Sequence, residues 1–188
     1  MQHRIVVSTE DVPEDGTLIA VAQREPEAFG SLYERYVTRV YRYLRARTRT
    51  EEDAADLTQQ VFLRAFDAFP TYRAQDVPFA AWLFRIARNA VIDSHRRQRD
   101  TRSWDGLPEA LQPTDTAGPE AAAIRAESLQ RLGDLLLRLD AGKREMLALR
   151  FAGGLTAREI ALVTGKSEAA TKKQLTRTIH YLKEHYHA

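Results

Sequence analysis

Apolar side chains recur every three or four residues along most of this 188-residue chain, and no stretch alternates convincingly between apolar and polar residues. That spacing follows one face of an α-helix, whereas a half-buried β-strand needs a period of two. Residues 29–44 show the pattern most clearly, with a predicted core face of Phe29, Leu32, Tyr33, Tyr36, Val40, Tyr41 and Leu44. The sequence therefore predicts an all-α fold.

Other helices in the first half are predicted from the same spacing and from signals at their ends. A short helix is predicted around Leu18–Gln23, before Pro26. Thr50 is a candidate N-cap for a helix that ends before Pro70, and the acids that follow it favour the positive end of the helix dipole. Pro78 is expected in the first turn of the next helix, where a proline is tolerated.

A break in the helical pattern predicts two domains. Residues 104–123 combine prolines with acids and threonines, a composition typical of an extended linker. Helices are predicted after it at about residues 124–139, 141–152, 156–163 and 167–186. The predicted organisation is a flexible N-terminal extension (1–16), a first small helical domain (17–102), an acidic linker (103–123) and a second small helical domain (124–188).

Composition narrows the class of protein. The chain has no cysteine, which excludes disulfides and thiolate chemistry and fits a reducing compartment. No apolar run approaches the length of a membrane span, so a cytoplasmic protein is expected. The net charge is only +2, but cations gather in residues 85–102 and 166–183, on either side of the acidic linker. Basic helices are typical of proteins that bind a polyanion, although solvated surface helices share this feature.

The most specific local motif lies at residues 155–167. Thr156 and Glu159 have the spacing of a capping box, and Gly165 can supply a left-handed turn before a helix capped by Ser167. This combination favours a DNA-binding helix-turn-helix over an ordinary helical hairpin. The second helix would present to a major groove the residues Lys172, Lys173, Gln174, Thr176 and Arg177.

A second candidate surface combines aromatic rings with arginines at residues 70–97. Rings such as Tyr72 beside guanidinium groups such as Arg73, Arg85 and Arg88 can hold unstacked bases against a phosphate backbone. Single-stranded DNA is the ligand that this arrangement indicates. Other rings, including Trp82, fall on the predicted core face, where packing is the better interpretation.

No catalytic or metal site is predicted. The acids at residues 51–56 stand at a helix start, where capping explains them. The histidines His180, His185 and His187 lack the spacing of a helical zinc pair, and no glycine-rich phosphate loop occurs. We therefore expect no enzymatic activity, no metal, no cofactor and no small-molecule substrate.

Several motifs together resemble the extracytoplasmic-function (ECF) class of bacterial sigma factors, the minimal two-domain members of the main sigma family. The resemblance runs from about Leu18 to Tyr186. Besides the helix-turn-helix, the segments that carry it are Pro26–Phe29, Leu32–Tyr36, Asp56–Ala65 and Phe79–Asn89. It implies a protein that directs core RNA polymerase to promoters, recognising the upstream promoter element and melting the downstream one.

The resemblance also implies roles for particular residues. The β′ clamp helices of the polymerase would contact Asp53, Asp56, Gln59, Gln60 and Arg64. The melting element would comprise Tyr72, Arg73, Arg85, Arg88, Asn89, Arg96 and Arg97. The second domain would touch the polymerase β flap and read promoter DNA through Ser167, Glu168, Lys172, Lys173, Gln174, Thr176 and Arg177. An anti-sigma factor is a further implied partner.

Some positions depart from the family pattern. Gln60 stands where an acid is usual, Asp140 where proline is common, and Thr171 and Gln174 where valine and arginine are usual. Glutamine favours adenine and arginine favours guanine, so the base preference of the second domain is left open. Two alternatives remain: a conventional helix-turn-helix regulator that binds duplex operator DNA, and a nucleic-acid-processing hydrolase.

Overall fold

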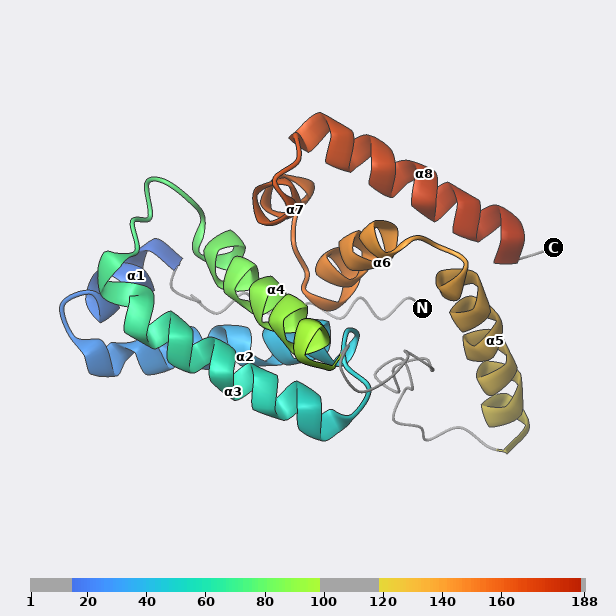
Figure 1. Ribbon diagram of the computed structural model, residues 1–188, viewed down its shortest axis with the longest axis horizontal. Helices are drawn as coiled ribbons and strands as arrows, with labels where there is room; N and C mark the ends of the chain where they lie inside the picture. Colours follow the sequence, from blue (N-terminus) through green and yellow to red (C-terminus); the bar gives the residue numbers. More distant parts are fainter. Residues whose placement is uncertain (1–14, 99–118, 187–188) are drawn as a thin grey trace, which may run out of the picture.

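The computed structural model describes residues 15–98 and 119–186 (Figure 1). The first segment contains α1 (Asp15–Ala22), α2 (Phe29–Arg45), α3 (Glu51–Ala68) and α4 (Phe79–Gln98), with short 3-10 turns η1 (Pro26–Ala28) and η2 (Phe69–Thr71). The second contains α5 (Pro119–Leu137), α6 (Ala141–Leu147), the π-helical turn η4 (Ala148–Ala152), α7 (Ala157–Thr164) and α8 (Glu168–Tyr186). Within these two segments, no helix is long and apolar enough to cross a membrane.

The helices α2, α3 and α4 form a bundle whose core is rich in aromatic rings. Phe69, Tyr72, Phe79 and Trp82 pack against one another where the end of α3 meets the start of α4, with ring centroids 4.9 to 6.4 Å apart. Edge-to-face and tilted contacts of this kind stabilise a core beyond simple burial. They fix the loop between α3 and α4 relative to the α4 helix.

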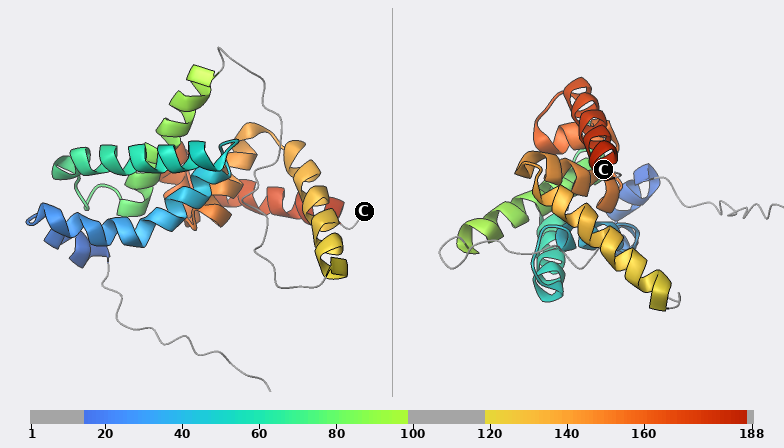
Figure 2. Two further views of the ribbon diagram at one scale, coloured as in Figure 1. Left: turned by 90° about the horizontal axis from the view of Figure 1, so that it is seen from below. Right: turned by 90° about the vertical axis from the view of Figure 1, so that its right-hand side faces the viewer.

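The second segment packs onto this bundle. Helix α7 contacts α4, and η4 contacts α2, so the buried apolar side chains of both segments form one continuous core. Both views of Figure 2 show α6, α7 and α8 beside the α2–α4 bundle, while α5 extends away from it and contacts α8. The contact is close at Gly153, where a Cβ atom would lie 2.7 Å from Cε1 of Phe84.

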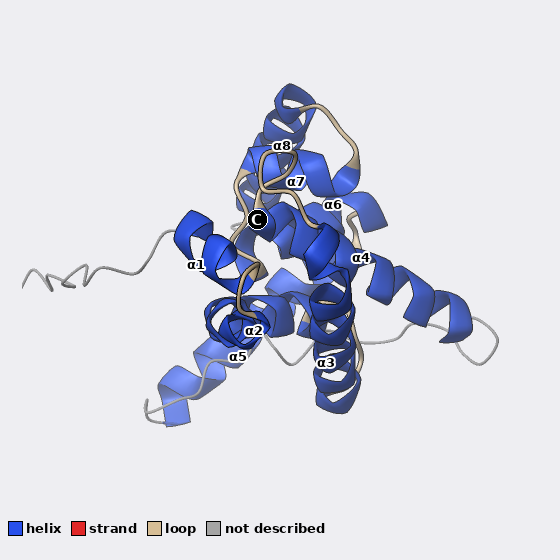
Figure 3. Cartoon of the chain, turned by 90° about the vertical axis from the view of Figure 1, so that its left-hand side faces the viewer, coloured by secondary structure: helices blue, strands red, loops and turns tan. Residues whose placement is uncertain are grey.

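Every regular element of the described segments is helical (Figure 3), which confirms the all-α prediction. The helix predicted from about residue 124 begins earlier, because α5 starts at Pro119. Proline lacks a backbone N–H, but the N–H groups of the first helical turn have no intrahelical acceptor. A proline can therefore begin a helix as well as interrupt one. The rest of the predicted linker (103–118) and most of the N-terminal extension (1–14) lie outside the described residues.

The core face predicted for α2 needs one correction. Tyr33 is 44% exposed, whereas Tyr43, which we did not place in the core, is completely buried. The ring of Tyr43 packs edge to face against Phe84, with centroids 5.5 Å apart. The second segment covers this side of α2, so α2 has a buried face that its own amphipathic pattern does not indicate.

Candidate nucleic-acid interface

The helix-turn-helix has the end signals that the sequence predicts. The backbone N–H of Glu159 donates to Oγ1 of Thr156 at 3.2 Å, and Oε2 of Glu159 accepts from the backbone N–H of Thr156 at 2.7 Å. Gly165 then adopts a left-handed conformation with φ of 70°. The capping box starts α7 and the glycine ends it, which sets the direction in which α8 leaves the turn.

Helix α8 has one buried face and one basic face. Ser167 caps it, because its Oγ accepts from the backbone N–H of Ala170 at 3.2 Å. Thr171 and Leu175 are buried. Exposed on the helix are Glu168, Lys172, Lys173, Thr176 and Arg177. This face therefore lies open for a ligand.

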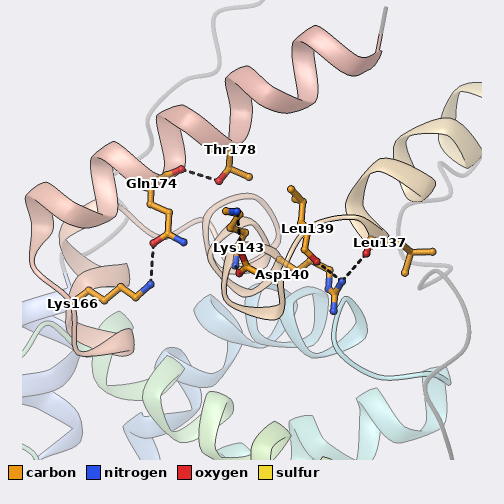
Figure 4. Close-up of polar contacts among 8 residues, drawn as sticks. Leu137, Leu139, Asp140, Lys143, Lys166, Gln174 and Thr178 are labelled. Carbon is orange, nitrogen blue, oxygen red and sulfur yellow. Dashed lines mark hydrogen bonds and ion pairs between the residues drawn. The ribbon is translucent and has the colours of Figure 1, made fainter. Parts of the chain in front are cut away.

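Two polar contacts organise the basic face of α8. Gln174 is partly buried, and its Oε1 accepts a hydrogen bond from Nζ of Lys166 at 2.9 Å (Figure 4). Lys172 lies 2.7 Å from Glu168, one turn earlier, and this hydrogen bond holds the pKa of the Glu168 carboxyl below its usual value. Glu168 is therefore an anion on a basic face, where it orients Lys172 rather than attracting phosphate.

The start of α6 is fixed by a cap that we did not predict. Asp140 accepts from the backbone N–H of Lys143 at 2.9 Å and forms an ion pair with its Nζ at 2.9 Å (Figure 4). The contacts with Lys143 lower the pKa of Asp140. Nearby, Nη1 of Arg144 donates to the backbone oxygens of Leu137 and Leu139. Asp140 is therefore the N-cap of α6.

The arginine face of α4 lies against the second segment. Nη2 of Arg85 donates to the backbone oxygen of Leu162 at 3.0 Å, and Nε of Arg88 lies 3.1 Å from Oε1 of Glu145. The side chains of Arg88 and Glu145 are only 29% and 12% exposed. Asn89, Arg96 and Arg97 are exposed further along the helix. The structure therefore brings these predicted residues onto one helix, but two of the arginines have protein partners.

Tyr72 must be removed from the candidate DNA contacts. It is 3% exposed, its hydroxyl donates to the backbone oxygen of Val77 at 2.8 Å, and burial raises its pKa to about 12. A ring that packs in the core has no face left for a base. Arg73 beside it is exposed and donates to the backbone oxygens of Pro70 and Tyr72, each at 3.2 Å.

The α3 residues predicted to contact the polymerase form a polar stripe that faces solvent. Thr50 caps the helix, accepting from the backbone N–H of Asp53 at 3.0 Å, and Asp53 is partly exposed. The rest of the predicted stripe is exposed, at Asp56, Gln59, Gln60 and Arg64. Arg64 lies 3.8 Å from Asp93 of α4, so this cation has a neighbour within the first domain.

An apolar groove lies beside the stripe, between α2 and α3. It encloses about 730 Å³ and includes Gln59 in its lining. Tyr33, Leu63 and Phe66 line it and are 44%, 58% and 44% exposed. Helical spacing places Phe66 on the apolar face of α3, and the sequence does not indicate that this face continues into an open groove. Large exposed apolar surfaces with polar neighbours are typical of protein interaction sites.

Family models match both segments. The Sigma-70 region 2 model matches residues 32–101 and the Sigma-70 region 4 model matches residues 129–179. Curated relatives include the ECF RNA polymerase sigma factor BldN of Streptomyces coelicolor, 36% identical over 182 residues that cover 96% of this chain and 69% of BldN. The ECF RNA polymerase sigma factor SigD of Mycobacterium tuberculosis is 39% identical over 151 residues, covering 77% of this chain and 70% of SigD.

Solved structures show the same fold. CnrH in complex with the cytosolic domain of CnrY superposes with a TM-score of 0.65 at 29% sequence identity, covering 90% of this chain and 95% of CnrH. RpoE of Bartonella quintana, solved with the anti-sigma factor NepR, has a TM-score of 0.65 at 21% identity over 85% of this chain and 96% of RpoE, a likeness of fold. The chain belongs to the ECF group of the sigma-70 family. It is a sigma factor, a protein that directs RNA polymerase to promoters.

Proposed function

We propose that three helices divide the work of promoter recognition: α3 binds the polymerase, α4 contacts the melted strand, and α8 reads the upstream element. The observation that carries this proposal is that each of these helices buries one face and exposes polar or basic side chains on another. The protein contributes no catalysis of its own and acts in the cytoplasm, where the polymerase works.

Two properties support the recognition role of α8: an α-helix fits the major groove, and this one exposes cationic side chains. An α-helix fits the major groove of B-DNA, and lysine and arginine side chains on its flanks can neutralise phosphates. Lys173 and Arg177 are exposed for that purpose, together with Thr176. A glutamine amide can pair with adenine, and Lys166 holds the amide oxygen of Gln174 on one side.

The melting role belongs to the arginine face of α4 and to Arg73 before it. Extruding a base from the duplex costs a few kcal/mol, which backbone cations and a base pocket must offset. Exposed Arg96 and Arg97, near the end of α4, suit phosphate contacts that do not depend on sequence. Asn89 can donate to and accept from a base edge.

The docking role of α3 rests on the stripe and the groove beside it. A polar stripe next to an apolar groove can bind a partner helix through both charge and burial. Within this proposal, the side chains that contact the clamp helices of the polymerase are Asp56, Gln59 and Gln60. Because the structures of CnrH and RpoE are complexes with other proteins, we also propose an anti-sigma partner that covers this surface when transcription is off.

Transcription with core polymerase tests the division of roles. On a duplex promoter, both Arg96→Ala and Gln174→Ala should lower open-complex formation. On a template with a premelted bubble, the Arg96→Ala defect should shrink, because melting is already done. The Gln174→Ala defect should persist on promoters that carry the matching upstream base, because the bubble does not replace that contact. If the premelted bubble rescues Gln174→Ala but not Arg96→Ala, the assignment of roles is wrong.

A further inference from the structure

A lysine in the turn between α7 and α8 reaches the helix that is proposed to read the promoter. Lys166 follows the left-handed Gly165, and its backbone N–H donates to the oxygen of Ala161 at 3.1 Å. The geometry of the turn therefore fixes the point from which the side chain extends. That side chain is exposed and contacts Gln174, eight residues later. The turn thus delivers a cation to a residue that the proposed function assigns to base reading.

The contact determines how the amide of Gln174 is oriented. Nζ of Lys166 lies 2.9 Å from Oε1 of Gln174, and an ammonium group can only donate hydrogen bonds. The amide oxygen must therefore face the lysine, and Figure 4 shows the amide nitrogen on the other branch of the group. Of the two ways in which a glutamine amide can be turned, Lys166 stabilises one.

The acid closest to Lys166 in the sequence has a partner of its own. Oε1 of Glu168 lies 2.7 Å from Nζ of Lys172, one turn along α8. Lys166, by contrast, contacts a neutral amide, which leaves its positive charge uncompensated. The Lys166–Gln174 pair therefore carries one positive charge on the basic face of α8.

The hydrogen-bonding groups that this pair presents are donors. The remaining N–H groups of the Lys166 ammonium can donate, as can those on Nε2 of Gln174. The acceptor of the pair is Oε1, and Lys166 already donates to it. The positive charge beside Oε1 opposes the approach of a further N–H donor from a base. The pair therefore resembles the guanidinium group of an arginine, which has donors and no acceptor.

The edges of the purines in the major groove distinguish a free glutamine from this pair. Adenine offers the acceptor N7 beside the donor N6, whereas guanine offers the acceptors N7 and O6. A free glutamine amide matches adenine, because its oxygen accepts from N6 while its nitrogen donates to N7. A pair that presents donors matches guanine and is unfavourable beside the N6 group of adenine.

We propose that Lys166 is a positioning residue for base recognition: it holds the Gln174 amide so that the pair prefers guanine, whereas Gln174 alone would prefer adenine. The inference rests on the proposed role of α8 in reading the upstream element. Lys166 acts through Gln174, and its ammonium completes the set of donors. The two side chains together take the place of the arginine that is usual at position 174.

The base preference at one promoter position tests this inference. Holoenzyme made from core polymerase and the full chain selects duplexes from a promoter library whose upstream element is randomised, and the selected duplexes are sequenced. The position read by Gln174 is the one where the preference is lost in Gln174→Ala. There the wild type should favour G·C over A·T about tenfold, and Lys166→Met should favour A·T over G·C by a similar factor.

Three further variants separate base reading from effects of charge and stability. Lys166→Arg keeps a donor-only cation and should retain the guanine preference. Lys183→Met removes the same charge from an exposed site near the end of α8 and should leave the base preference unchanged. In a Gln174→Arg background, which should itself prefer guanine, Lys166→Met should have no effect on the preference. A lysine that only stabilised the turn would leave the ratio of the two base pairs unchanged, because this ratio does not depend on the fraction of folded protein.

The outcomes separate this inference from the function beneath it. If Gln174→Ala loses a base preference that Lys166→Met retains, the inference is wrong and the reading role of α8 stands. An adenine preference in the wild type has the same meaning. If Gln174→Ala alters no position, the assignment of Gln174 to a base is wrong, and the inference with it. A guanine preference that survives Gln174→Ala but not Lys166→Met would assign the base to Lys166 alone and overturn its positioning role.

Discussion

At the scale of single residues, Asp140 has a local role that can be measured. Its carboxylate caps α6, and replacing an N-cap aspartate by alanine costs about 1 kcal/mol of stability. We expect Asp140→Ala to lower the free energy of unfolding by that amount at pH 7, as measured by urea denaturation. Asp134→Ala, an exposed acid within α5, should have little effect. Equal losses in the two variants would contradict the capping role.

The same cap predicts a dependence on pH. Because the folded pKa of Asp140 is lowered, its contribution is fully present above the unfolded pKa of about 3.9 and is lost as pH falls through the folded value. The difference in unfolding free energy between the wild type and Asp140→Ala should therefore be constant from pH 5 to pH 7 and shrink below about pH 4. A difference that persists unchanged at about pH 2 would argue against the ionised cap.

Gly165 is a second residue whose replacement should lower the stability of the protein by a predictable amount. Its φ of 70° is strained for a residue with a side chain, and no atom lies close to where a Cβ would stand. Gly165→Ala should therefore destabilise the protein by about 1–2 kcal/mol through backbone strain alone, and Gly165→Asn by less. Thermal unfolding of the two variants measures this order, and the reverse order would contradict a purely conformational cost.

At the scale of elements, α3 offers a test of polymerase docking. Asp56 is exposed on the stripe, so Asp56→Lys should weaken binding to core polymerase about tenfold, or 1.4 kcal/mol, without unfolding the domain. Glu34→Lys, with the same charge change on exposed α2, is the control. Arg64 is a less clean choice because reversing its charge would place a carboxylate near Asp93. A titration in which both lysine variants bind like the wild type would reject the stripe as the docking site.

At the scale of the whole molecule, one continuous core joins the two segments. Phe84 is completely buried between Tyr43 and Gly153, so it packs at the contact between the segments. We expect the wild type to unfold in one calorimetric transition. Phe84→Ala should cost about 3–5 kcal/mol and separate the transition into two, because its cavity lies in the contact itself.

Phe66→Ala provides the comparison for this experiment. Phe66 is half exposed on the α2–α3 groove, away from the contact, so its loss should leave a single transition at a slightly lower temperature. A wild type that already unfolds in two transitions would show that the common core does not couple the segments.

The fold class and the helix ends could be predicted from the sequence, because the capping and spacing signals that set them are local. The capping box of Thr156 and Glu159, the left-handed Gly165 and the inward face of α8 depend on residues within a few turns of one another. The Thr50 cap and the exposed stripe of α3 are equally local. Helical periodicity and end signals therefore determined the all-α fold and most helix faces, although not the side of α2 that buries Tyr43. The order of the motifs pointed to the family.

Only the tertiary structure decided how the two segments meet. The contacts of Arg39 with Gly153 and of Arg88 with Glu145 join residues 114 and 57 positions apart, and neither pair has a local pattern that predicts it. Tyr72 is buried because Trp82 and Phe79 close over it, which its neighbours in sequence do not reveal. Side chains separated by long stretches of chain are brought together by packing, so which arginines are free and which are occupied is a property of the folded molecule.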